Sequence, residues 1–252
     1  MILFKKLKQN HINIFCKRYF WIYALIAVVS FVFIKTAFTN KAYTLNASSV
    51  CAADLICVVK ENPLFLPLIA SAFLYIGIKE LEHSFSYNVI LRYTERKQMY
   101  KSQLLDVVLN SAILALFVTT LLCAESVMLT KSPMNWNVQN SYYVFMNGNT
   151  YNHTLLLFVA LIFVYVFSFV CTQMLIALYF SWRKINAVYT FFVLFAFVGL
   201  IMLINRAKSM LDCDSYGITI LNVLPYIAVF VITLLLSLLV VMNKTVLKRE
   251  FV

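Results

Sequence analysis

Apolar residues run along this chain in long continuous blocks, not at the spacing of amphipathic helices or strands. A helix needs roughly 20 apolar residues to cross a bilayer. Blocks of this length therefore favour membrane-spanning helices over the elements of a soluble core. The pattern predicts six spans, namely Phe20–Phe38, Pro63–Ile78, Leu104–Leu129, Thr154–Phe180, Ala187–Ile204 and Thr219–Met242.

The second block is the shortest, but its start is well marked. Asn62 is a residue type that caps helices, and Pro63 suits the first helical turn. Lys79 and Glu80 extend this helix to about residue 80 by reaching toward the membrane interface. We expect one all-α domain over residues 1–252. Residues 1–18 are expected to form a helix lying in the membrane interface, with a basic tail that only sets topology as the alternative.

The composition agrees with a membrane protein. The chain is 63% hydrophobic and 12% charged, with a mean hydropathy of +0.85, whereas soluble domains carry about 25% charged residues. Most of the 21 Lys and Arg residues fall on the side that holds both termini, which predicts that this side is cytoplasmic. We therefore expect a multi-pass protein of the cell membrane. Nucleic-acid binding is not indicated, because the net charge of +11 is scattered between the spans.

Two longer segments are predicted to lie outside the cell. Thr39–Asn62 includes the mildly apolar stretch Val50–Val59, which we expect to pack against the membrane. Cys51, Cys57 and Cys213 also lie outside, where a disulfide between two of them and unpaired thiols are both open. Thr130–His153 is rich in aromatic residues, which favours interfacial anchors over a dedicated ligand platform. Its aromatic residues include Trp136, Tyr142, Tyr143, Phe145 and Tyr151.

The chain lacks the motifs of the common catalytic and cofactor sites. None of its four glycines belongs to a GxxxxGK[ST] loop, and its three histidines fall on both sides of the membrane. We expect no catalytic residue, metal or bound cofactor. Asp106, Asn110 one turn later and Glu125 are the candidates for an intramembrane polar site, with hydration near the interface as the alternative. Other polar residues in spans are expected to join helices, among them Ser168, Thr172, Gln173 and Asn222.

Phe85–Gln103, between the second and third predicted spans, is basic and aromatic and is predicted to face the cytoplasm. On a helical wheel Phe85, Val89, Tyr93 and Tyr100 share one side, which Arg96 interrupts. Aromatic and charged side chains on one helix are what a soluble partner protein contacts. A helix that rests on lipid is the alternative.

Six spans, cytoplasmic termini, an interfacial N-terminal helix and a helical inner loop resemble the permease subunit of an ABC-2-type transporter. Ile90–Leu104, ILRYTERKQMYKSQL, resembles the Arg-rich loop after the second span of small permeases found beside bacteriocin and lantibiotic genes in Gram-positive bacteria. Leu221–Tyr226, LNVLPY, resembles the proline-bearing segment ahead of the last span in that class. The chain departs from the family at Met99-Tyr100, where the aromatic residue that usually follows the basic pair is displaced.

The resemblance implies that a separate ATPase subunit binds ATP and Mg²⁺ and docks on the inner face. It also implies a second permease chain and an amphipathic peptide or lipid-like substrate, exported or cleared in self-immunity. The ATPase-coupling residues that it implies are Tyr87, Arg92, Tyr93, Glu95, Arg96, Lys97 and Tyr100.

Two other functions stay open on the residues alone. One is an ATPase-independent immunity or sensor protein that binds its target through the outer aromatic loop. The other is an intramembrane enzyme that acts on lipid through Asp106, Asn110 and Glu125.

Overall fold

The computed structural model describes residues 19–44, 49–62, 65–85, 96–130, 132–150, 154–183, 185–186, 188–196, 199 and 220–242. The regular elements within these ranges are helices, as predicted. The interfacial helix expected at 1–18, Cys213 and the predicted contact residues Tyr87, Arg92, Tyr93 and Glu95 lie outside the described residues. The labelled helices are α2 (Phe20–Thr44), α3 (Ala52–Glu61), α4 (Phe65–Ser84), α6 (Arg96–Thr130), α7 (Tyr142–Asn147), α8 (Leu155–Trp182) and α10 (Ile220–Met242).

Three of the described helices are long and apolar enough to cross a membrane, which indicates a membrane protein. They are Phe20–Asn40 within α2, Lys97–Thr130 within α6, and Leu155–Trp182, which is α8. Helices α4 and α10 cover most of the second and sixth predicted blocks. Residues 188–196 are helical and cover part of the fifth.

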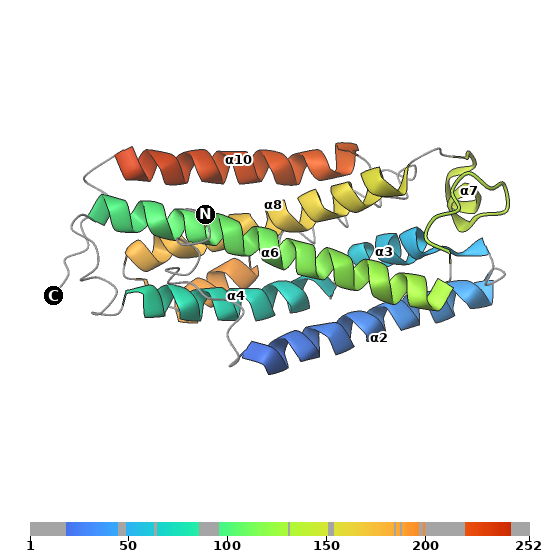
Figure 1. Cartoon of the computed structure of the whole chain (residues 1–252), viewed down its shortest axis with the longest axis horizontal. Coiled ribbons are helices and arrows are strands. Elements are labelled where there is room, and N and C mark those ends of the chain that lie inside the picture. Colours follow the sequence, from blue (N-terminus) through green and yellow to red (C-terminus); the bar gives the residue numbers. More distant parts are fainter. Residues whose placement is uncertain are drawn as a thin grey trace, which may run out of the picture.

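The long helices run side by side along the molecule, with α6 and α8 at the centre of the bundle (Figure 1). α10 packs mainly on α8, and α2 packs on α3, α4 and α6. Large apolar side chains remain exposed on the outer faces of α2 and α10, including Trp21, Leu25, Ile232 and Leu236. Such faces are suited to lipid, in which apolar side chains need no protein cover.

α4 and α8 approach each other closely at Gly77. A Cβ atom at this position would overlap the Sδ and Cε atoms of Met174. Gly77 therefore gives α8 room to place Met174, which is buried, against the backbone of α4.

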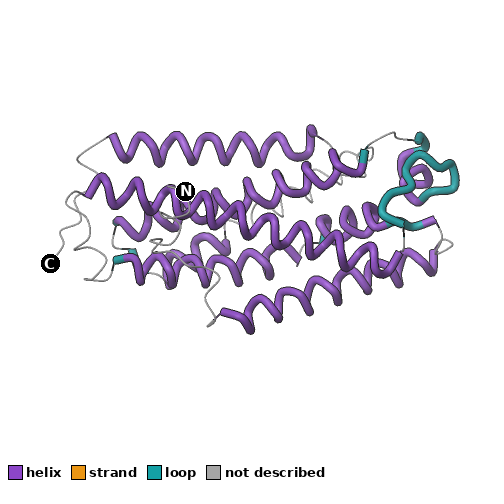
Figure 2. The backbone as a smooth tube through the Cα atoms, in the orientation of Figure 1, coloured by secondary structure: helices purple, strands orange, loops and turns teal. Residues whose placement is uncertain are grey.

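The second predicted span is part of a longer, broken helix. α3 and α4 follow one another along the bundle (Figures 1 and 2). Asn62, predicted to cap the start of a helix, is instead the C-cap of α3. Its backbone is extended (φ −68°, ψ 120°), and its N–H donates to the Val59 carbonyl over 3.1 Å. The amide of Phe65 in turn donates to the Asn62 carbonyl over 3.3 Å.

α3 lies inside the bundle, so the prediction that Val50–Val59 packs against the membrane surface is wrong. Every side chain from Val50 to Cys57 is buried, because α3 packs between α2 and α6. The outer segment thus contributes to the core.

α6 begins at Arg96, not at Leu104 as predicted. Arg96–Gln103, which the sequence assigned to a separate cytoplasmic segment, forms the first two turns of this long helix. The change matters for function because it fixes the end of the predicted contact segment rigidly to a central helix.

Candidate functional site

Ser84, Phe85, Tyr100, Gln103 and Trp182 meet where α4 ends, α6 begins and α8 ends; we call this group the Trp182 junction. The Trp182 indole Nε1–H donates to Gln103 Oε1 over 2.7 Å. The Gln103 Nε2–H donates to Ser84 Oγ over 2.8 Å, and the Ser84 hydroxyl donates to the Leu81 carbonyl over 2.6 Å. Gln103 therefore ties the ends of three helices through both halves of its amide.

Aromatic contacts complete the Trp182 junction. The rings of Phe85 and Tyr100 both pack edge-on against Trp182, with centroid distances of 5.3 and 5.6 Å. Gln103 and Trp182 are only 1% and 3% exposed, so their hydrogen bond is shielded from water. A buried hydrogen bond of this kind fixes geometry because an unmatched polar group there is costly.

The Trp182 junction changes the role that we assign to one of the predicted contact residues, Tyr100. Tyr100 was expected to anchor a soluble ATPase, but its side chain is completely buried against Trp182. It cannot contact a partner there, so we assign it to the internal framework. Lys97, one turn earlier on α6, is exposed as a contact residue must be.

At the same end of the bundle, another hydrogen bond joins Tyr19, just before α2, to α4. The Tyr19 hydroxyl donates to Glu80 Oε1 over 2.7 Å, and Glu80 is buried. The expectation that Glu80 reaches out to the membrane interface is therefore wrong, because an internal donor satisfies its carboxylate. Lys79 and Glu82 instead form an exposed ion pair, with 3.0 Å between Lys79 Nζ and Glu82 Oε2.

The candidate intramembrane polar residues do not form one site. Asp106, Asn110 and Glu125 are all buried. Asp106 and Glu125, however, stand near opposite ends of α6, about 28 Å apart along a helix that rises 1.5 Å per residue. Glu125 Oε2 accepts a hydrogen bond of 2.7 Å from the Ser30 hydroxyl, which joins α6 to α2. Glu125 thus acts as a helix-joining residue, and its distance from Asp106 excludes a shared catalytic carboxylate pair.

The polar residues of α8 differ from expectation. Ser168 and Thr172 donate to carbonyls one turn earlier in α8, Val164 and Ser168 respectively, instead of bridging to other helices. Gln173 is 2% exposed, and neither of its amide atoms has a hydrogen-bond partner among the described residues. The side chain of Asn222 lies outside the described set.

At the opposite end of the bundle, aromatic residues of 132–150 fold onto α3; we call the group Asp54, Trp136, Tyr143 and Phe158 the Trp136 cap. The Trp136 Nε1–H donates to Asp54 Oδ1 over 2.8 Å. The Trp136 ring stacks on Tyr143 at 4.3 Å and packs edge-on against Phe158 at 5.3 Å. Backbone bonds from Ala52 to Ser132 and from Ala53 to Pro133 fix the loop to the first turn of α3.

Asp54 also organises the start of α3. Its Oδ2 accepts from the Cys51 amide over 2.9 Å, which satisfies one of the N–H groups that a helix start leaves open. Burial raises the pKa of the Cys51 thiol to about 12, with the nearby Asp54 carboxylate acting in the same direction. No disulfide joins Cys51 to Cys57, so the bond between them that the sequence left open is absent.

Comparison with protein-family models, with curated proteins and with solved structures found no match to this chain. The function must therefore be argued from the two ends of the bundle and the space between them. Sequence reasoning did not single out Trp182, Gln103 or Asp54, because each acts through a partner about 80 residues away. Two features of the sequence could have drawn attention to these residues. Trp182 stands beside the basic pair Arg183-Lys184, and Asp54 is an acidic residue inside an apolar stretch.

Proposed function

We propose that this chain is the membrane-spanning subunit of an ATP-driven transporter of the ABC-2 type, with ATP and Mg²⁺ bound by a separate ATPase subunit. The observation that carries the proposal is that both ends of the basic segment converge on Trp182. Phe85 is the first residue of the segment and Tyr100 lies one turn before its last residue, Gln103, and both rings pack on the same indole. A force on the segment is therefore delivered to α4, α6 and α8 together, which coupling to an ATPase requires.

In this proposal the Trp182 end faces the cytoplasm of a multi-pass cell-membrane protein with six spans and both termini inside. The ATPase contacts Tyr87, Arg92, Tyr93, Glu95, Arg96 and Lys97. The arginines pair with acids of the ATPase and Glu95 with a base. A second permease chain completes the unit, which moves an amphipathic peptide or lipid-like compound in export or self-immunity.

Purification of the tagged chain from its native membranes tests the proposal. We expect an ATPase with Walker motifs to co-purify, and its ATP hydrolysis to depend on the complex. Arg92→Glu combined with Arg96→Glu is expected to abolish co-purification. Arg183→Glu is the matched control, because Arg183 is an exposed basic residue at the same end but outside the segment. Normal ATPase binding and hydrolysis with the double variant would contradict the coupling role.

The alternative, a sensor or immunity protein that binds its target through the aromatic loop, is less well supported. Trp136, Tyr142 and Tyr143 are buried, and Trp136 serves to hold Asp54. Phe145, at 69% exposed, is the main aromatic of this loop open to a target among the described residues. Protection that persists after deletion of every neighbouring ATPase gene would favour this alternative.

A further inference from the structure

The exposed face of α6 changes from basic to apolar near the start of the helix. Lys97 and Lys101 lie one turn apart on this face, and Leu105 and Leu116 follow them. The four residues fall within about 100° of one another on a helical wheel of 3.6 residues per turn. α6 runs along the bundle, with its first turns at the end where α4 finishes (Figure 1). One uninterrupted helix therefore carries two cations and an apolar face in fixed register.

The length of the apolar face locates the bilayer. Leu105 is the first large apolar residue of α6 that is exposed, and Met128 is the last. They lie about 35 Å apart at the helical rise of 1.5 Å per residue, which a moderately tilted helix needs to cross a hydrocarbon core about 30 Å thick. Trp21, 79% exposed near the start of α2 at the same end, agrees with this placement because tryptophan favours the interface. We therefore place the boundary of the hydrocarbon core near Leu105.

The two lysines stand at different heights above that boundary. Along the helix axis Lys101 lies about 6 Å and Lys97 about 12 Å beyond Leu105. The headgroup layer of one leaflet is about 5–7 Å thick, because the whole bilayer exceeds its hydrocarbon core by about 10–15 Å. Lys101 thus lies in the layer that holds the lipid phosphates, whereas Lys97 projects beyond it.

The surroundings leave the charge of Lys101 open to a partner. Lys79, another exposed lysine at this end, pairs with Glu82 over 3.0 Å, whereas Lys101 has no ion pair with any described residue. The acidic residues of α6 in the described part of the chain, Asp106 and Glu125, are buried inside the bundle.

The chemistry of this face matches a phospholipid with a net negative charge. A phosphate would accept charge-assisted hydrogen bonds from the Lys101 ammonium, and an acyl chain would lie along Leu105 and Leu116. An acidic protein surface could satisfy the ammonium, but it would leave the apolar face next to it uncovered. A zwitterionic lipid could cover the apolar face, but it would leave the positive charge uncompensated.

We propose that Lys101, together with Leu105 and Leu116, binds an anionic phospholipid at the Trp182 end of the bundle. Lys97 is left to contact a soluble partner. The lipid holds α6 at the height of the Trp182 junction, because Gln103 lies two residues after Lys101. The inference rests on the proposed function for placing this lipid in the cytoplasmic leaflet and for naming an ATPase as the partner of Lys97. Lipid binding itself requires only this chain.

Native mass spectrometry of the purified full chain tests binding. It compares the affinities for phosphatidylglycerol and for phosphatidylcholine with the same acyl chains. We expect tighter binding of phosphatidylglycerol. Lys101→Gln is expected to weaken it by about fivefold, the effect of one lysine near a membrane surface, without changing the binding of phosphatidylcholine. Lys101→Arg keeps the charge and is expected to retain the binding of phosphatidylglycerol.

Two further variants separate the position of a charge from its presence. Lys97→Gln removes the lysine that projects beyond the headgroups, so it is expected to weaken phosphatidylglycerol binding less than Lys101→Gln does. Lys79→Gln is the matched control, because Glu82 already neutralises this exposed lysine at the same end, and it should not weaken the binding of phosphatidylglycerol. Thermal unfolding of each variant checks that it remains folded, and Lys101→Arg controls for the substitution itself.

The depth of the lysines can be measured independently. An environment-sensitive fluorescent amino acid is encoded at position 97, 101 or 105 of the chain in nanodiscs. We expect lipids brominated in their acyl chains to quench position 105 most strongly, aqueous iodide to quench position 97 most strongly, and position 101 to lie between them. Equal iodide quenching at 97 and 101 would contradict the placement of Lys101 among the headgroups.

Unchanged phosphatidylglycerol binding in Lys101→Gln, or an equal loss in Lys97→Gln, would overturn the inference. So would a Lys101→Gln variant that keeps its lipid but loses a co-purifying protein, because Lys101 would then contact that protein. Because the lipid assay contains no ATPase, its outcome is independent of whether an ATPase co-purifies with the chain.

Discussion

The hydrogen bond between Trp182 and Gln103 makes a quantitative prediction about the Trp182 junction. Trp182→Phe keeps an aromatic ring against Phe85 and Tyr100 but removes the indole N–H. Gln103 Oε1 is then buried without its donor, at a cost of about 1–3 kcal/mol. Gln103→Met has the complementary effect, because it preserves length and leaves the Trp182 N–H without its acceptor, at a similar cost of about 1–3 kcal/mol.

The double variant removes both halves of the bond, so neither group is left unmatched. We therefore expect its loss of unfolding free energy to be smaller than the sum of the two single losses, by about 1 kcal/mol or more. The loss of one indole ring affects Trp182→Phe and the double variant equally, so the difference isolates the hydrogen bond. Ser84 Oγ keeps its bond to the Leu81 carbonyl in all variants, which limits secondary effects.

Reversible unfolding in mixed micelles of a mild detergent and dodecyl sulfate measures these free energies. Variants at Ile113, which is exposed on α6, provide the baseline for substitutions that do not touch the junction. Additivity of the two single variants within about 0.3–0.5 kcal/mol would refute the reasoning, because independent sites add to that precision.

Two further predictions concern the core and the thiols. Gly77→Val is expected to destabilise the bundle by about 1–3 kcal/mol, because the new side chain overlaps Met174. Adding Met174→Ala to this variant should restore part of the lost stability. Thermal unfolding measures the effect, and Gly199→Ala is the control because its new Cβ atom meets no atom within 4 Å. Cys51 is expected to resist maleimide at pH 8, because raising its pKa from 9.0 to about 12 lowers its thiolate fraction about a thousandfold. Its labelling should rise with pH toward 12, or at once in denaturant, and rapid labelling of the folded chain at pH 8 would show that Cys51 is not buried.

Sequence reasoning worked where structure depends on a local pattern. The apolar block at Thr154–Phe180 coincides with helix α8, Leu155–Trp182, which is long and apolar enough to cross a membrane, and Thr154 is its N-cap. The start predicted for the second span at Asn62 and Pro63 was only partly right, because α4 begins at Phe65 while Asn62 ends α3 instead of capping α4. Phe85 and Tyr100, placed on one side of a single helical wheel, do share a contact surface, although Phe85 follows the end of α4 and Tyr100 lies in α6.

It failed where a residue's role depends on a distant partner. α3 was assigned to the membrane surface because ten mildly apolar residues do not reveal that α2 and α6 close around them. Tyr100 was assigned to a partner protein because Trp182, which buries it, lies 82 positions later.

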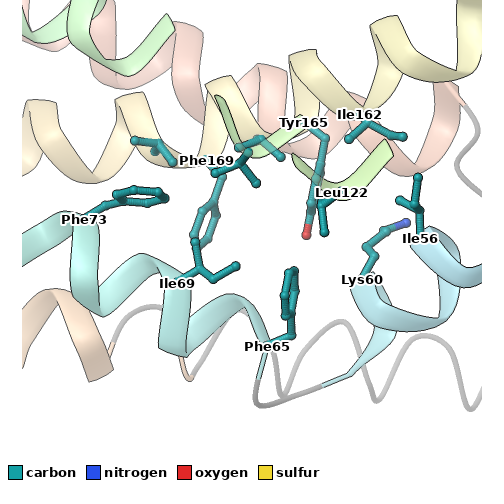
Figure 3. A pocket seen from close by; sticks show the side chains of 12 residues that line it. Ile56, Lys60, Phe65, Ile69, Phe73, Leu122, Ile162, Tyr165 and Phe169 are labelled. Carbon is teal, nitrogen blue, oxygen red and sulfur yellow. The ribbon is translucent and has the colours of Figure 1, made fainter. Parts of the chain in front are cut away.

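The break at Asn62 gives the second traverse of the bundle two unequal attachments. α3 is held by the Trp136 cap through Asp54, whereas α4 is held at its far end by Ser84 and Gln103. An unbroken helix would transmit a displacement of one end directly to its other end. A break between the two attachments is the place where a rotation of α4 relative to α3 would be taken up. Lys60 of α3 and Phe65 of α4, on either side of this break, line a pocket between α3, α4, α6 and α8 (Figure 3), so a rotation of α4 at the break would change the dimensions of that pocket.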